Sequence, residues 1–132
     1  MEKINAILTG IRKSLPGSTK WEEDNRFNTL LTTASAVDAD SLLKKLTPLF
    51  ENIWNSSTSG KATKPEKKLM KSLSGINNDQ MLFTSIEGET VLFAAWWPWG
   101  DKSKVSLRIG LFNGEMEING RDQIRSYLTG TP

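Results

Sequence analysis

The segment from Glu89 to Trp97 limits the fold of this chain more than any other, because it is strand-length and apolar on both sides. Alternate residues of a strand point to opposite faces of a sheet. One face of the segment carries Val91, Phe93, Ala95 and Trp97, and the other carries Leu92, Ala94 and Trp96. A strand of this kind lies in a sheet that is covered on both sides, or one of its faces meets a partner.

Residues 1–75 mainly show the apolar spacing of amphipathic helices. The pattern predicts four helices: Met1–Leu15, Phe27–Val37 after a capping box at Thr19–Glu22, Leu42–Trp54 capped by Asp38 or Asp40, and a short one from the capping box Thr63–Glu66 to Gly75. Helix or strand stays open over 27–37, because three threonines there favour a strand from Phe27 to Thr33. Pro48 predicts a kink in the third helix, or a restart at Thr47.

After residue 75 the apolar period changes from that of a helix to that of a strand. The pattern predicts strands over Met81–Ile86, Glu89–Trp97, Val105–Phe112 and Glu115–Ile118. Glu87-Gly88 and Asn113-Gly114 are the expected two-residue turns, and the second turn would place Leu111 opposite Met116 and Ile109 opposite Ile118. A last helix, Arg121–Leu128, is expected to begin at Asn119 as its cap.

Together these segments predict a single α+β domain over residues 1–132. Residues 1–75 would be mainly helical, residues 76–119 would form a four-stranded antiparallel meander, and residues 120–129 would form a closing helix. Because helix follows helix and strand follows strand, the order disfavours a parallel sheet built from βαβ units.

The absence of Cys and His removes most of the chemistry that small enzymes use. Without Cys there is no disulfide, thiol nucleophile, iron–sulfur cluster or thiolate zinc site. Without His there is no imidazole base and no Ser-His-Asp triad, and any metal would need oxygen ligands. We expect no cofactor and no metal. The chain also has no signal-like start and no run of 18 apolar residues, so we expect a cytoplasmic protein without a membrane segment.

Three indoles lie close together in Trp96-Trp97-Pro98-Trp99, at the end of the apolar strand. Exposed indoles of this kind stack on bases or anchor a protein partner. The alternative is that Trp96 and Trp97 fill two core layers while Trp99 covers one of them. We predict Trp96, Trp97, Trp99 and Arg108 as contact residues, the arginine by stacking on an indole or by pairing with a carboxylate.

Nearly all of the net charge of +2 comes from one short segment, residues 61–71, which holds five lysines and one glutamate. On a helix, four of the lysines would form one stripe, suited to a phosphate backbone or an acidic protein. The alternative is an ordinary hydrated helix surface. The predicted basic patch consists of Lys61, Lys64, Lys67, Lys68 and Lys71.

Two pairs of carboxylates, Glu87 with Glu89 and Glu115 with Glu117, were weighed as catalytic or metal-binding groups. Catalytic carboxylates need enough burial to shift their pKa. All four are expected at turns or on a hydrated strand face, so the sequence favours a non-catalytic protein over an enzyme that uses carboxylates or a hard metal ion.

The arrangement of elements resembles that of small bacterial proteins that bind another protein, such as toxin-immunity proteins and secretion chaperones. This resemblance implies a bacterial protein-binding module of the immunity or inhibitor type. The expected partner is another protein or a second copy of the chain. Nucleic-acid binding through the lysine stripe is the alternative.

Overall fold

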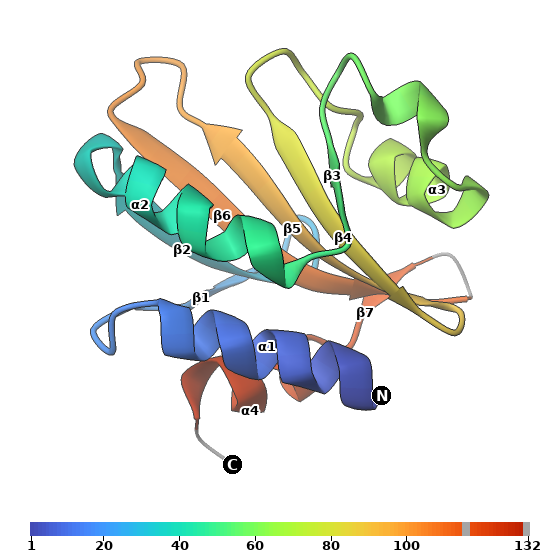
Figure 1. Cartoon of the computed structure of the whole chain (residues 1–132), viewed down its shortest axis with the longest axis horizontal. Coiled ribbons are helices and arrows are strands. Elements are labelled where there is room, and N and C mark those ends of the chain that lie inside the picture. The colour runs from blue at the N-terminus through green and yellow to red at the C-terminus, as the bar shows by residue number, and fades with distance from the viewer. Residues whose placement is uncertain (115–116, 131–132) are drawn as a thin grey trace.

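The computed structural model, described for residues 1–114 and 117–130, has a seven-stranded antiparallel sheet at its centre (Figure 1). The order of strands across the sheet is β1-β2-β6-β5-β4-β3, and β7 pairs with one end of β6. The strands are β1 (Glu22–Asp24), β2 (Thr29–Ser35), β3 (Asn52–Trp54), β4 (Met81–Glu87), β5 (Thr90–Pro98), β6 (Lys104–Phe112) and β7 (Ile118–Asn119). The expected α+β class is therefore confirmed.

Helices cover the two faces of the sheet unequally (Figure 1). Three of them, α1, α2 and α4, pack on one face, which we call the three-helix face. On the opposite face, which we call the α3 face, α3 packs against β4 and β5. The helices are α1 (Glu2–Ser14), α2 (Ala36–Leu46), α3 (Lys64–Ser72) and α4 (Arg121–Thr129), with 3-10 turns at Thr47–Leu49 and Ser59–Lys61.

The central strand β5 is buried from Val91 to Trp96 on both faces by the chain's own helices, which is the first of the two alternatives that its sequence left open. Leu92, Ala94 and Trp96 belong to the core under the three-helix face. Val91, Phe93 and Ala95 belong to a second core under α3. The sheet is thus the middle layer of three, and β5 is apolar on both sides because two separate cores meet there.

The expected count of four strands is wrong, because three further strands, β1, β2 and β3, lie within the N-terminal half that was expected to be mainly helical. Residues 27 and 28 belong to the β1–β2 turn, residues 29–35 form β2, and α2 begins at Ala36, so the strand alternative was closer than the helix. Thr29, Thr32 and Thr33 suit a strand, and β2 gains a full antiparallel partner in β6, from Leu30 opposite Ile109 to Ser35 opposite Lys104. The capping box expected at Thr19–Glu22 starts no helix, because Glu22 begins β1.

The helix expected to reach Trp54 ends at Leu46 instead. Pro48 lies in a single 3-10 turn, because its ring lacks the N–H that an α-helix needs at that position. The chain then extends, and β3 pairs with β4 at the sheet edge. At the other end α2 begins at Ala36, with Ser35 as N-cap rather than Asp38 or Asp40.

The meander is confirmed for β4, β5 and β6, but its turns differ in detail from those expected. Glu87 pairs with Thr90, so the first turn is Gly88-Glu89, with Gly88 at a φ of 61°. In the last hairpin Leu111 pairs with Asn119 and Phe112 with Ile118, so the pairing expected between Ile109 and Ile118 is wrong.

The connection in that hairpin is longer than the two residues expected, because the amide of Asn113 donates a hydrogen bond to the carbonyl of Glu117. The longer connection changes which residues of β6 and β7 lie opposite each other. The expected strand start at Glu115 and the expected position of Met116 lie outside the described residues. The cap of α4 also differs, because Gly120, at a φ of 86°, precedes the helix while Asn119 lies in β7.

The carboxylate of Glu87 caps the N-terminus of α1 from the β4–β5 turn. Its oxygens accept hydrogen bonds from the backbone amides of Lys3 (3.2 Å) and Ile4 (3.0 Å). These bonds, above all that from Ile4, outweigh desolvation and lower the pKa of Glu87. A carboxylate at a helix N-terminus also interacts favourably with the helix dipole. Glu87 therefore has a structural function.

Acid is expected to destabilise this domain through Glu87 and Glu51. The pKa of Glu51 is lowered by its hydrogen bond with Lys3. A carboxyl whose pKa is lower in the folded state stabilises fully above its unfolded pKa of about 4.3, and the contribution is lost as the pH falls through the folded value. Urea midpoints measured between pH 6 and pH 3 should fall with pH, and less steeply in Glu87→Gln. A midpoint that rises on acidification would contradict this.

Candidate interaction surface

Part of the α3 face carries no helix, and the described surface there includes aromatic and cationic side chains. α3 packs over β4 and β5, whereas β6, β2 and β1 extend beyond it on the same face. The strand register aligns Trp97, Ser106 and Thr33 across β5, β6 and β2, and Arg108 lies opposite Leu31. We call this region, together with Phe27, Arg26, Trp99 and Lys104 at its margin, the open face.

The structure separates the three neighbouring indoles into three environments. Trp96 is only 4% exposed and packs in the core under the three-helix face, so the expectation that it contacts a partner is wrong. Trp97 points to the open face and is partly buried. Trp99 follows β5 and is 41% exposed. Because alternate strand residues face opposite ways, Trp96 and Trp97 do not belong to one surface.

Trp97 is the centre of a stack of side chains from three parts of the chain. The guanidinium of Arg108 lies 4.6 Å from the centre of the Trp97 ring and 5.7 Å from that of Phe27. The Phe27 ring meets Trp97 edge-on at 5.3 Å. Contacts of these kinds contribute about 0.5–1.5 kcal/mol each beyond area burial. The stack closes the α3-face core where α3 itself does not reach.

Arg108 is also paired with a carboxylate of its own chain. Its Nε lies 3.1 Å from Oδ2 of Asp24, and the side chains of both residues are largely buried. Asp24 further accepts hydrogen bonds from the hydroxyl of Thr29 and the amides of Arg26 and Phe27. Both roles expected for Arg108, stacking and pairing, are thus filled within the domain, and its contact with a partner stays a prediction.

Trp99 is exposed but held in one position. Its indole Nε1 donates to Oγ of Ser106 at 2.9 Å, and its backbone amide donates to the carbonyl of Lys104. Nζ of Lys104 lies 5.1 Å from the ring centre. Asp101 orders the rest of the loop by accepting from the amide and hydroxyl of Ser103, which lowers the pKa of Asp101. A fixed, exposed ring beside a cation is a suitable anchor for a partner.

The sequence analysis missed Phe27, Arg26, Asp24 and Lys104 as members of this region. Arg26 lies 4.8 Å from the centre of the Phe27 ring, and both come from the β1–β2 turn. The only available signal was the turn-like Asn25-Arg26-Phe27-Asn28 between two polar segments. A helix over residues 27–37 is incompatible with a turn at residues 25–28, so the helix prediction excluded this turn.

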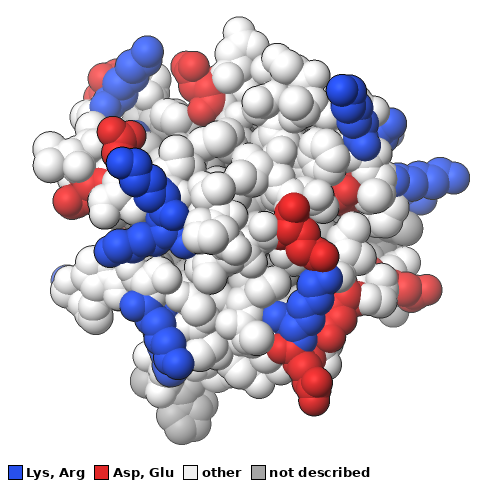
Figure 2. Space-filling model, viewed as in Figure 1, with Lys and Arg blue, Asp and Glu red and all other residues white. Residues whose placement is uncertain are grey.

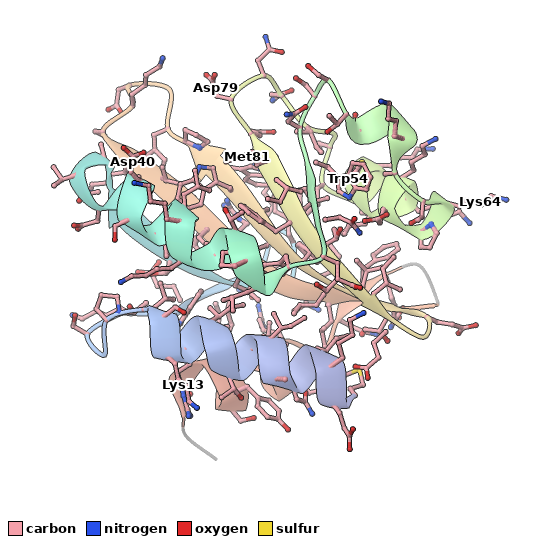
Figure 3. All side chains as sticks on the ribbon, in the orientation of Figure 1. Lys13, Asp40, Trp54, Lys64, Asp79 and Met81 are labelled. Atoms are coloured by element: carbon pink, nitrogen blue, oxygen red, sulfur yellow. The ribbon has the colours of Figure 1, made fainter. Side chains whose placement is uncertain are left out.

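The basic patch lies apart from the indoles, on α3 and the 3-10 turn before it. Lys61, Lys64, Lys67, Lys68 and Lys71 are all exposed. Figure 3 shows Lys64 pointing away from the body of the protein. The nucleic-acid alternative combined these lysines with a stacking Trp, but no described contact joins them to Trp97 or Trp99.

Glu66, the one acidic residue of that segment, is fully buried beneath α3. It forms the predicted capping box with Thr63 and also accepts hydrogen bonds from Nε1 of Trp54 (2.7 Å) and the hydroxyl of Thr84. Figure 3 shows Trp54 between β3 and α3. Burial acts to raise the pKa of Glu66, but the hydrogen bonds from Thr84, Thr63 and Trp54 outweigh it, and the pKa is lowered.

The carboxylates considered for catalysis are dispersed. Glu87 caps α1, Glu89 and Glu117 are exposed, and Glu115 lies outside the described residues. Among the residues that the structure describes, no three Asp or Glu side chains come together as a metal site would require. None of the described helices combines the length and the apolar content needed to cross a membrane.

The open face can therefore hold a partner group by apolar contact, stacking and ion pairing. Its exposed charged groups include Arg26 and Lys104, each beside an aromatic ring, and Glu22, which lies opposite Leu31 on the same face. Comparison of the chain with protein-family models, with curated proteins and with solved structures finds no match.

Proposed function

We propose that this chain is a non-catalytic binding domain of the immunity or inhibitor type, which recognises another protein through the open face. The observation that carries the proposal is Trp99, a large aromatic ring that is 41% exposed yet held by Ser106 and flanked by Lys104. Holding an indole in place before binding reduces the entropy that binding would otherwise cost.

Charge complementarity indicates what the partner presents there. Arg26 and Lys104 are exposed cations next to the rings of Phe27 and Trp99. Leu31 and Thr33 provide less polar surface between them, and the exposed carboxylate Glu22 lies on the edge strand opposite Leu31. A protein segment with an apolar or aromatic side chain between carboxylates matches this pattern. We expect the apolar group to contact Trp99 and a carboxylate to approach Lys104.

The test is affinity capture with the immobilised domain, followed by titration of the captured protein. Trp99→Ala should weaken its binding by more than about 1 kcal/mol, as truncation of an aromatic anchor does, and leave the urea midpoint almost unchanged. Val37→Ala is the matched control, since Val37 is 90% exposed on α2, on the other side of the sheet. Trp97→Ala is unsuitable because Trp97 supports the core.

Two results would contradict this proposal. If Trp99→Ala bound the partner as tightly as the wild type, Trp99 would not be the anchor of the interface. A wild type that sediments as a dimer while Trp99→Ala sediments as a monomer would identify a second copy of the chain as the occupant of the open face instead.

A further inference from the structure

The lysines of residues 61–71 form a more strongly basic surface than the sequence suggests, because their one acidic neighbour faces inward. The segment has five lysines and one glutamate, a net charge of +4. Glu66 is fully buried and hydrogen-bonded to Thr63, Thr84 and Trp54, so its carboxylate lies beneath α3. The outer side of α3 and the preceding turn therefore present five cations and no anion of their own. We call this set, Lys61, Lys64, Lys67, Lys68 and Lys71, the lysine surface.

The lysine surface is unpaired within the described part of the chain. No ion pair joins any of its lysines to a described carboxylate. Figure 2 shows lysine and arginine side chains on the side where Figure 1 places α3, and further blue groups lie on the opposite side of the view. The charge there is thus available to an external anion.

The helix that carries the lysines is held firmly against the sheet. Leu69, Met70 and Leu73 are buried in the α3-face core, and Glu66 links α3 to β3 through Trp54 and to β4 through Thr84. The backbone positions of the lysines on α3 are accordingly fixed relative to the sheet. Over the seven residues from Lys64 to Lys71 the helix rises about 10 Å, a length of DNA duplex that carries about three phosphates per strand.

The composition of the lysine surface favours a phosphate backbone over a protein as its ligand. Protein interfaces have a buried apolar centre and contain few lysines. Within the segment Ala62, Leu69 and Met70 are buried and Pro65 is half-buried, which leaves only lysine and hydroxyl side chains fully exposed. A surface of ammonium groups without an apolar centre is suited to sequence-independent contacts with phosphates.

We propose that the lysine surface binds the phosphate backbone of a nucleic acid, independently of the open face. Four or five lysines, each neutralising one phosphate, would release about as many counterions. The binding would be weak at physiological salt, insensitive to base sequence and strongly dependent on ionic strength.

The test is fluorescence polarisation with a labelled 25-base-pair DNA duplex and a labelled 25-nucleotide oligo(dT), at salt concentrations from 50 to 300 mM. For the duplex we expect the logarithm of the binding constant to fall with the logarithm of salt at a slope of about −3 to −4, with a shallower slope for oligo(dT). Binding to the duplex should weaken about 100-fold between 50 and 200 mM salt. Comparison of the two probes shows which form of the backbone is preferred.

The variant Lys64→Gln/Lys67→Gln/Lys68→Gln/Lys71→Gln should lose most of this binding and flatten the slope to about −1. Its matched control is Lys13→Gln/Lys20→Gln/Lys44→Gln/Lys45→Gln, which removes the same charge from exposed lysines outside the 61–71 segment and should bind like the wild type. All eight changes leave core residues intact, so both variants should fold, and circular dichroism will verify this.

Trp99→Ala should bind the oligonucleotides with the affinity and the salt dependence of the wild type. The nucleic-acid proposal and the open-face proposal can therefore be contradicted independently of each other. No measurable binding by the wild type at 50 mM salt would overturn the proposal, and so would equal losses in the two quadruple variants. It would also be overturned if poly-L-glutamate displaced the oligonucleotide better than unlabelled DNA at equal charge concentration, since the ligand would then be an acidic polypeptide.

Discussion

Replacing Glu66 with alanine is expected to lower the free energy of unfolding by about 3 kcal/mol. The carboxylate is fully buried and accepts hydrogen bonds from Trp54 Nε1, from Thr84 and from both the amide and the hydroxyl of Thr63. Each buried donor left without an acceptor costs about 1–3 kcal/mol, and rotation of the two hydroxyls to other partners offsets some of that cost. The helix also loses one half of its capping box.

Urea denaturation at pH 7 measures this loss, with Asp79→Ala, a change of an exposed carboxylate, as the control. Glu66→Gln keeps the volume and one acceptor oxygen, so its loss should be smaller than that of Glu66→Ala. Because the pKa of Glu66 is lowered in the folded state, its contribution is present above about pH 4.3 and disappears as the pH falls further. The difference between wild type and Glu66→Ala should therefore narrow between pH 5 and pH 3. A loss below about 0.5 kcal/mol at pH 7 would contradict this account of Glu66.

Gly110→Ala should destabilise the domain by about 2–3 kcal/mol although it adds a single methyl group. Gly110 lies opposite Phe93 in the centre of the sheet, under the α3-face core. A Cβ atom there would lie 2.6 Å from Cζ of Phe93 and 2.9 Å from Cγ2 of Thr29. The Phe93 ring and Thr29 are fully buried, so relief of the overlap requires the closely packed core to move.

The control for this change is Gly60→Ala, where a Cβ atom would meet nothing within 4 Å, and its effect should be within about 0.5 kcal/mol. Phe93→Leu in the Gly110→Ala background separates overlap from other causes. If the overlap is responsible, the double variant loses less than the sum of the two single losses. Additive losses, or a Gly110→Ala midpoint equal to that of Gly60→Ala, would contradict the steric explanation.

Tertiary pairing decided the elements that the sequence analysis placed wrongly. Local spacing favoured helices over 27–37 and up to Trp54, yet β2 and β3 are strands because β6 and β4 offer them backbone partners. β2 pairs with residues more than 68 positions later in the chain. A short segment whose apolar spacing suits both a helix and a strand adopts the one for which the rest of the fold supplies hydrogen-bond partners. The local sequence does not show which partners the fold supplies.

The sequence likewise predicted some residues of the candidate surfaces, and the structure revealed the others. The sequence predicted Trp96, Trp97, Trp99 and Arg108 as one group, of which Trp96 proved to be core, and the five lysines as another. The lysine group depends only on spacing along a single helix. The loop that brings Phe27 onto Trp97, and Asp24 to Arg108 across 84 residues, became visible only once β1 and β2 were placed in the sheet.

By itself the sequence determined that β5 is apolar on both faces, that Thr63 caps α3 with Glu66 as its capping partner, and that no imidazole or thiol is available for chemistry. These features depend on residue type and on spacing within one element. Only the tertiary structure decided that Trp96 is core while Trp99 is exposed, and that Glu66 is withdrawn from the lysines beside it. The physical reason is that the burial of a side chain depends on which distant elements pack over it, and contacts between distant residues leave no local pattern in the sequence.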